Sequence, residues 1–306
     1  MTGSFLPVLL ALVCAPLLSG IINRIKACYA GRQGRPLLQL YFDLFKLLQK
    51  GEVISRTTTW IFVAGPSVYL ATIICALLVV PFGTVRAPFG FTGDFILMAY
   101  LMGFGRFALM LAALDTGSAF EGMGASREAA FSALAEPVIF LCFLALGGGL
   151  WPSLYAFCQA ASLEIWTFTR PELWLIPLVL FVLLLVENCR LPVDDPNTHL
   201  ELTMIHEVII LDHSGPNLAF ILYASSLKLW LFALLLVNVL APKIFGHTPL
   251  ESALELALVL AGIFGTAVLV GVVESCLARL RLLVVPRILG MAGMLAALTL
   301  VVTLFR

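Results

Sequence analysis

Eight stretches of about twenty mostly apolar residues dominate this chain and restrict its fold more than any other feature. Helices of that length, rising 1.5 Å per residue, match a hydrocarbon core of roughly 30 Å. Because 61% of the 306 residues are hydrophobic and only 12% are charged, one water-soluble core cannot hide them. The sequence therefore predicts an all-α integral membrane protein, a single polytopic domain over residues 1–306. We place eight transmembrane helices at residues 5–28, 60–81, 94–114, 129–150, 173–186, 219–240, 252–273 and 288–304, with the fifth shorter than the rest.

The basic residues between these windows are unevenly distributed. Twelve of the 18 Lys and Arg residues lie at the end of or after the first, third, fifth and seventh windows, whereas four lie on the opposite side. Lys and Arg concentrate in cytoplasmic loops, so we expect both termini outside and the long polar loop between the fifth and sixth helices in the cytoplasm. The first window has no preceding Lys or Arg and continues at membrane length, which predicts that it is retained rather than cleaved as a signal peptide.

The first cytoplasmic loop contains an amphipathic segment. Apolar residues recur there at helical spacing against polar ones, which predicts a helix lying in the interface after the first span. One face carries Leu37, Leu38, Tyr41, Phe42, Phe45 and Leu48, and the other carries Gln39, Asp43, Lys46 and Lys50. Such a helix either rests on the lipid headgroups or forms the wall of a cavity or a docking surface.

The long loop between the fifth and sixth windows, residues 187–215, concentrates titratable groups. It holds six of the 18 carboxylates and three of the four histidines. Groups of this kind are costly to keep near hydrocarbon. The segment is therefore either a water-exposed loop or a polar site at the membrane surface.

Three charged residues lie deep inside predicted spans, away from their ends. Arg106 is about eight residues from the cytoplasmic end of its helix, roughly 12 Å deep, and Glu136 is about seven residues from the end of the next, roughly 10 Å deep. An unpaired charge at depth costs about 2.5 to 3.5 kcal/mol on insertion scales, so we expect the two to pair or to share a hydrated pocket. The pair is either a structural link between two helices or part of a proton relay. Lys228, near mid-membrane, also needs an acid or water beside it.

Two further polar features have simpler interpretations. The segment LDTGSAFEGMGASREA, residues 114–129, has three glycines among polar residues, as expected of a tightly turning cytoplasmic loop. Glu255, close to the outer end of its span, is expected to reach the membrane surface.

Several chemistries lack their signatures. The seven cysteines include no Cys-x-x-Cys pair, which argues against an iron-sulfur or zinc site in this chain. The spacing of His199, His206 and His213 is not diagnostic of zinc, and His206, His213 and Ser214 match no catalytic triad signature. The chain has no glycine-rich phosphate loop, and its zero net charge gives no indication of nucleic acid as a partner.

The residues resemble a known family. ENCRLPVDD after the fifth window is similar to the signature of the complex I membrane subunit 1 family, with Glu187, Arg190, Pro192, Asp194 and Glu201 at family positions. Other stretches resemble one branch, the membrane anchor subunits of group 4 NiFe hydrogenases of the hydrogenase-4 and formate hydrogenlyase type. These stretches are GRQGRP followed by LLQLYFDLFKLL, residues 114–129 followed by AEP, the SLK around Lys228, and ESCLARLRLLVVPR.

The resemblance implies a noncatalytic subunit in the bacterial cytoplasmic (inner) membrane that holds no cofactor itself. The NiFe centre and iron-sulfur clusters would belong to partners: hydrogenase large and small subunits, an iron-sulfur subunit and antiporter-like membrane subunits. With the residue-level reasoning above, it predicts proton transfer by Glu136, Arg106, Glu187, Asp194, Glu201, Glu207 and Lys228. It predicts docking of the soluble partners by Arg32, Arg35, Asp43, Lys46, Arg190, Asp195, His206 and Asp212.

Two other functions fit the same composition. A quinone-chamber subunit of a respiratory NADH dehydrogenase belongs to the same family, although Asn197 and His199 interrupt its usual run of glutamates. A stand-alone secondary transporter is expected to show an internal repeat and interrupted helices, and neither is clear in this sequence.

Overall fold

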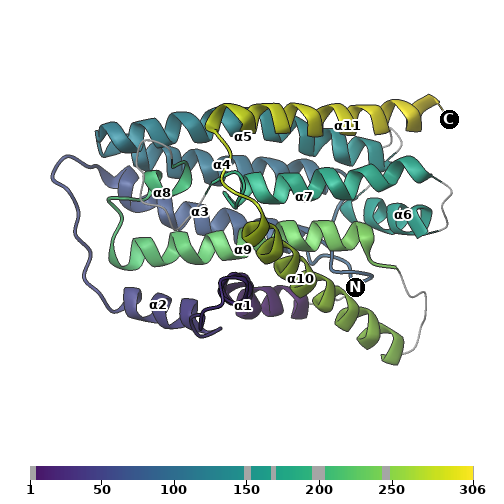
Figure 1. The fold of residues 1–306 in the computed structure, drawn as a ribbon, viewed down its shortest axis with the longest axis horizontal. Coiled ribbons are helices and arrows are strands. Elements are labelled where there is room, and N and C mark those ends of the chain that lie inside the picture. The colour runs from purple at the N-terminus through teal and green to yellow at the C-terminus, as the bar shows by residue number, and fades with distance from the viewer. Residues whose placement is uncertain (1–4, 148–152, 167–169, 195–203, 243–248, 306) are drawn as a thin grey trace.

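The structure, a computed structural model, describes residues 5–147, 153–166, 170–194, 204–242 and 249–305. Seven helices in the described residues are long and apolar enough to cross a membrane, as expected of a multi-pass membrane protein. They are α1 (Leu6–Tyr29), α3 (Trp60–Val79), α4 (Asp94–Asp115), α5 (Ala119–Gly147), α9 (Gly215–Leu240), α10 (Pro249–Cys276) and α11 (Val285–Phe305). Most run along one common direction, and α10 crosses the bundle obliquely (Figure 1).

Shorter helices connect or flank the long ones. The amphipathic segment of the first loop forms α2 (Gln39–Leu48), so the helix predicted after the first span is confirmed. The others are α6 (Leu154–Trp166), η1 (Pro171–Trp174), α7 (Leu175–Glu187), α8 (His206–Ile209) and η2 (Leu282–Val284). The apolar sequence did not single out α6.

The fifth predicted span is the least certain of the eight. It corresponds to η1 and α7, and α7 has 13 residues, fewer than a helix needs to cross a bilayer on its own. In Figure 1 it lies along the long helices. The structure therefore supports seven spans outright, and the count of eight remains a prediction.

The prediction of a loop at residues 114–129 is wrong for most of that segment. Helix α5 begins at Ala119, ten residues before the predicted start, and the turn before it contains Gly117 at a φ of +71°. Ala, Met, Glu and Arg in this segment favour helix despite the glycines. The polar residues also do not face water throughout, because Glu121 and Glu128 are buried.

Helix α9 is the centre of the bundle. In its membrane-length window 78% of the residues are buried, compared with 28% for the C-terminal helix. Most of its length is apolar on every side, with Trp230 fully buried. A charged side chain on this helix, such as Lys228, therefore meets protein rather than lipid and requires a partner inside the bundle.

Helices α3 and α4 approach closely because small residues face each other. A Cβ added at Gly65 would lie 2.7 Å from the Cβ of Ala112 and 3.0 Å from the carbonyl oxygen of Ala108. Small residues of this kind let two backbones pack tightly inside a membrane.

Replacing Gly65 with Ala should therefore destabilise the protein by about 1 to 3 kcal/mol, the usual cost of overpacking, although Ala is the better helix former. The matched control is Gly265→Ala, since nothing lies within 4 Å of a Cβ added there. Thermal unfolding of the two detergent-purified variants measures the difference. Equal midpoints would show that the α3–α4 contact is not tight.

Candidate functional site

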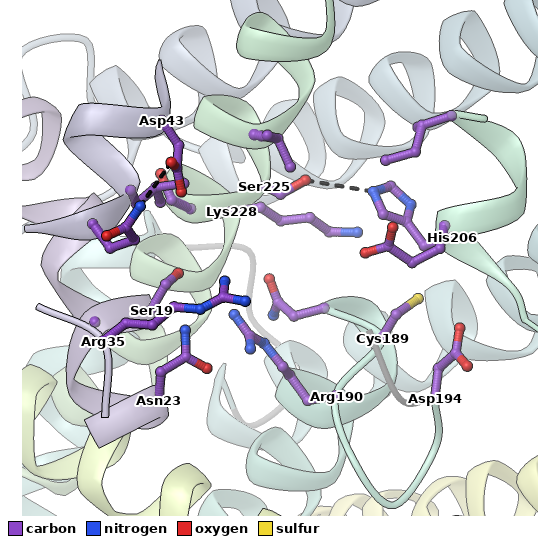
Figure 2. Close-up of a pocket in the computed structure, with 18 of the residues that line it drawn as sticks. Ser19, Asn23, Arg35, Asp43, Cys189, Arg190, Asp194, His206, Ser225 and Lys228 are labelled. Atoms are coloured by element: carbon purple, nitrogen blue, oxygen red, sulfur yellow. Dashed lines mark hydrogen bonds between the residues drawn. The ribbon is translucent and has the colours of Figure 1, made fainter. Parts of the chain in front are cut away.

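A polar cavity of about 310 Å³ opens between α1, α2, α9 and the segment that follows α7 (Figure 2). Arg35 and Asp43 line it from the first loop and α2, and Lys228 projects into it from α9. Glu187, at the end of α7, also lines it. The amphipathic α2 therefore serves as a cavity wall, one of the two roles open to it.

Beyond this cavity, four charged side chains contact one another in sequence. The Nζ of Lys228 lies 3.0 Å from Glu187 Oε2, and Arg106 Nη1 donates to Glu187 Oε1 at 2.7 Å. Arg106 Nη2 donates to Glu136 Oε1 at 2.8 Å. We call Lys228, Glu187, Arg106 and Glu136 the charge network. Its two cations and two carboxylates alternate, so each buried charge has an opposite neighbour.

The pairing of Arg106 with Glu136, predicted from their matching depths, is confirmed. The structure adds that the same guanidinium binds Glu187. Exposure of the side chains falls from 41% for Glu136 to 6% for Arg106 and 1% for Glu187. The network thus runs from a half-exposed carboxylate into the interior.

Glu136 faces a groove of about 380 Å³ between α4 and α5, lined by aromatic side chains. Tyr100, Phe104 and Phe107 are exposed around it. A Cβ at Gly103 would lie 3.1 Å from Glu136 Oε1, so the glycine leaves room for the carboxylate on α4. The charge network therefore joins the polar cavity at one end to this groove at the other.

Glu128 is an acid that the sequence analysis did not select. It is buried on α5, close enough to Arg106 and Lys228 to interact electrostatically, but it forms no ion pair with either. The prediction of a loop at residues 114–129 gave Glu128 no position on a helix, and so no predicted neighbours. Eight residues separate it from Glu136, a spacing that places both on neighbouring faces of one helix.

Other charged residues of the central segment hold elements together. Asp194 is buried, pairs with Arg279 at 2.8 Å and accepts the backbone N–H of Ile205 at 2.8 Å. Glu274 of α10 forms ion pairs with Lys26 at 2.8 Å and with Arg190 at 3.7 Å. These ion pairs link the end of α7 to α1 and to the segment after α10.

The remaining predicted site residues separate into three groups. His206 and Glu207 line the cavity with Arg190 and Asp194. Arg32, Lys46 and Asp212 are exposed. Asp195 and Glu201 lie outside the described residues, as does His199. Proton transfer and docking by these residues remain predictions.

Two histidines in the segment between α7 and α9 are neutral at pH 7. Burial, with the charge of Lys228, lowers the pKa of His206 to about 4. Burial alone lowers the pKa of His213 to about 4, and its ring stacks on Phe62 at 4.1 Å between centroids. His206 also has Ser225 Oγ 3.4 Å from its Nε2.

One set of three described residues has the composition and spacing to hold a metal ion. The ligand atoms of Glu128, Cys189 and His206 all lie within 4.8 Å of one another. Burial raises the pKa of the Cys189 thiol well above its usual value, so the thiol is protonated at pH 7.

The opposite end of the bundle carries a second polar cluster. Asn238, fully buried, accepts from the N–H of Gly83 at 2.9 Å and donates to the carbonyl of Pro81 at 2.7 Å. Glu255 is buried and accepts from Thr84 Oγ1 at 2.6 Å, so it does not reach the surface as expected. Asn238 is ten residues from Lys228 on α9, about 15 Å away, and the residues between them are apolar.

The sequence and the fold were compared with known proteins. A profile of the family described as NADH dehydrogenase matches residues 3–305. The chain is 33% identical to formate hydrogenlyase subunit 4 of Escherichia coli over 297 residues, which cover 92% of each protein. It is 30% identical to hydrogenase-4 component C of the same organism over 301 residues, 94% of this chain and 90% of that one.

The fold has a match among solved structures. A chain in the structure of the membrane-bound sulfane sulfur reductase, an archaeal respiratory membrane complex, superposes with a TM-score of 0.82. The superposition covers 98% of both chains at 19% sequence identity. This likeness shows a shared fold.

Replacing Arg106 with Met should leave two carboxylates without their shared cation. Removing one partner of a buried ion pair costs about 3 to 5 kcal/mol, so we expect a strong loss of thermal stability in the purified protein. The control is Arg281→Met, at an exposed position. A loss no larger than the control's would mean that the charge network does not support the fold.

The neutral His213 predicts a dependence of stability on pH. Its folded pKa of about 4 is below its unfolded value of 6.5, so the unfolded state binds the proton first. The stabilisation is fully present above pH 6.5 and is lost as pH falls toward 4. His213→Phe keeps the stacking on Phe62 and removes the proton site. The gap between variant and wild-type melting temperatures should widen in favour of the variant as pH falls; a constant gap would contradict the assignment.

Proposed function

This chain belongs to the NADH dehydrogenase family, and on that premise we propose that it is the noncatalytic membrane anchor and proton-transfer subunit of an energy-converting NiFe hydrogenase complex. Its full-length similarity to formate hydrogenlyase subunit 4 and hydrogenase-4 component C supports this branch of the family. In this proposal the NiFe centre and iron-sulfur clusters are held by partner subunits, and this chain binds neither.

The observation that carries the proposal is the charge network between the polar cavity and the aromatic groove. A proton from water in the cavity reaches Lys228 and Glu187, which both line it. A proton leaves the other end through Glu136, whose side chain is 41% exposed in the groove. Ionisable groups at successive depths are what proton movement into a membrane requires.

Arg106 couples the two carboxylates rather than carrying the proton. A guanidinium stays charged throughout the physiological range, and here it donates to Glu187 and Glu136 together. When Glu136 takes up a proton, Arg106 has one less negative partner and binds Glu187 more strongly. Protonation at one end of the charge network therefore changes the proton affinity at the other.

The route leaves the chain sideways in this proposal. The nine residues of α9 between Lys228 and Asn238 bring no ionisable group into the outer half of the bundle. A half-exposed carboxylate is costly in lipid, so a membrane partner covers the groove at Glu136. We assign that place to an antiporter-like membrane subunit, which takes over the proton.

The soluble hydrogenase arm docks at the opposite end of the route, around the mouth of the polar cavity. Arg32, Arg35 and Lys46 are exposed there on the first loop and α2, and Asp212 is exposed on the central segment. The large and small hydrogenase subunits and an iron-sulfur subunit are the partners proposed for this face. In this proposal the docking face lies on the cytoplasmic side of a bacterial inner membrane, with both termini outside, which the concentration of Lys and Arg on that side supports.

A second candidate is a quinone-chamber subunit of a respiratory NADH dehydrogenase. The cavity favours it, since about 310 Å³ is within the range of small-molecule pockets. Mild-detergent purification followed by identification of the co-purifying chains separates the two functions. A soluble hydrogenase large subunit supports the first, whereas NADH-oxidising subunits with bound quinone support the second.

The test of the route is Glu136→Gln in the assembled complex. We expect assembly to be retained, and hydrogen turnover or proton pumping into sealed vesicles to fall at least about tenfold, since a well-placed proton-transfer group contributes 10²-fold or more. Glu255→Gln is the matched control, a buried carboxylate in a long helix outside the charge network. A Glu136→Gln complex that turns over and pumps like the control would remove Glu136 from the route.

A further inference from the structure

We propose that Glu128, Cys189 and His206 form a binding site for a divalent metal ion of the Zn²⁺ type, on the inner wall of the polar cavity. Their ligand atoms all lie within 4.8 Å of one another. This inference does not rest on the proposed function, because it uses three residues outside the charge network.

The donor set selects the kind of metal. A carboxylate oxygen, an imidazole nitrogen and a thiolate sulfur together suit borderline ions such as Zn²⁺, whereas Mg²⁺ and Ca²⁺ prefer oxygen alone. Three protein ligands leave one of the four zinc positions open to water.

Three elements bring the ligands together. Glu128 comes from the N-terminal part of α5, Cys189 follows α7, and His206 begins α8. Cys189 has a φ of +46°, in the left-handed region that few residues with a side chain adopt. Ser225 Oγ, 3.4 Å from Nε2 of His206, restrains the imidazole from α9.

The site has both space and access. A small pocket of about 10 Å³, roughly the volume of one water-sized sphere, is lined by Glu128 and Cys189. On the other side, Cys189 and His206 line the 310 Å³ cavity, where Figure 2 shows them on the same wall as Asp194. An ion entering from the water-filled side therefore meets the sulfur and imidazole first and the buried carboxylate behind them.

The Cys189 sulfur binds the metal as a thiolate. A divalent ion that takes the sulfur displaces the thiol proton, which goes to water. Glu128, which forms no ion pair with Arg106 or Lys228, offers its carboxylate to the same ion.

The proposal is tested on the whole membrane complex, stripped with chelator, equilibrated with zinc chloride and freed of excess metal. We expect one more zinc per complex in the wild type than in Cys189→Ser, counted by mass spectrometry. X-ray absorption at the zinc edge should show sulfur at about 2.3 Å and nitrogen or oxygen at about 2.0 Å. Glu128→Gln and His206→Ala should each raise the zinc Kd at least about tenfold.

Cys28→Ser is the matched control, because Cys28 is an exposed cysteine on α1 that offers a thiol without the other two ligands. It should keep the zinc that Cys189→Ser loses. Equal zinc content in the wild type and Cys189→Ser, or an unchanged Kd in Glu128→Gln, would overturn the site. If Cys189→Ser does not assemble, wild-type spectra decide: a zinc shell without sulfur overturns the proposal. None of these results bears on the proton route through Glu136, which the Glu136→Gln complex tests separately.

Discussion

One guanidinium shared by two carboxylates organises one half of this helix bundle. Arg106 of α4 donates to Glu187 at the end of α7 and to Glu136 of α5, and Glu187 in turn pairs with Lys228 of α9. Four helices thus meet at one electrostatic centre. Because an unpaired charge at this depth is costly, the side chains hold one another in place, and the helices that carry them have little freedom to slide.

The two ends of the bundle differ in kind. At the end that carries the charge network, the charges border a polar cavity on one side and an aromatic groove on the other. At the other end Asn238 accepts the backbone N–H of Gly83, and Glu255 accepts the hydroxyl of Thr84. The apolar stretch of α9 between Lys228 and Asn238 separates the two polar regions.

The sequence predicted a contact correctly where the free-energy cost of burying a charge decided it. The depths of Arg106 and Glu136 predicted their contact, because a buried charge needs a partner and consecutive spans are usually neighbours. It failed for Glu128, since the glycines and charges of residues 114–129 predict a loop, whereas the segment is helical from Ala119 onward. The contacts of Glu187 with both Arg106 and Lys228 were also out of reach, because they join residues 81 and 41 positions apart in the chain.

The sequence by itself determined that this chain is a bundle of membrane-length helices with an amphipathic helix after the first. The length of an apolar stretch and the periodicity of its apolar residues depend only on residues close together in the chain. Both can therefore be determined without knowing which helices pack against each other. Only the tertiary structure decided which acids meet which bases, that α9 lies inside, and that Glu128, Cys189 and His206 converge. Those facts depend on how helices distant in the chain pack together, and no local pattern of residues records that packing.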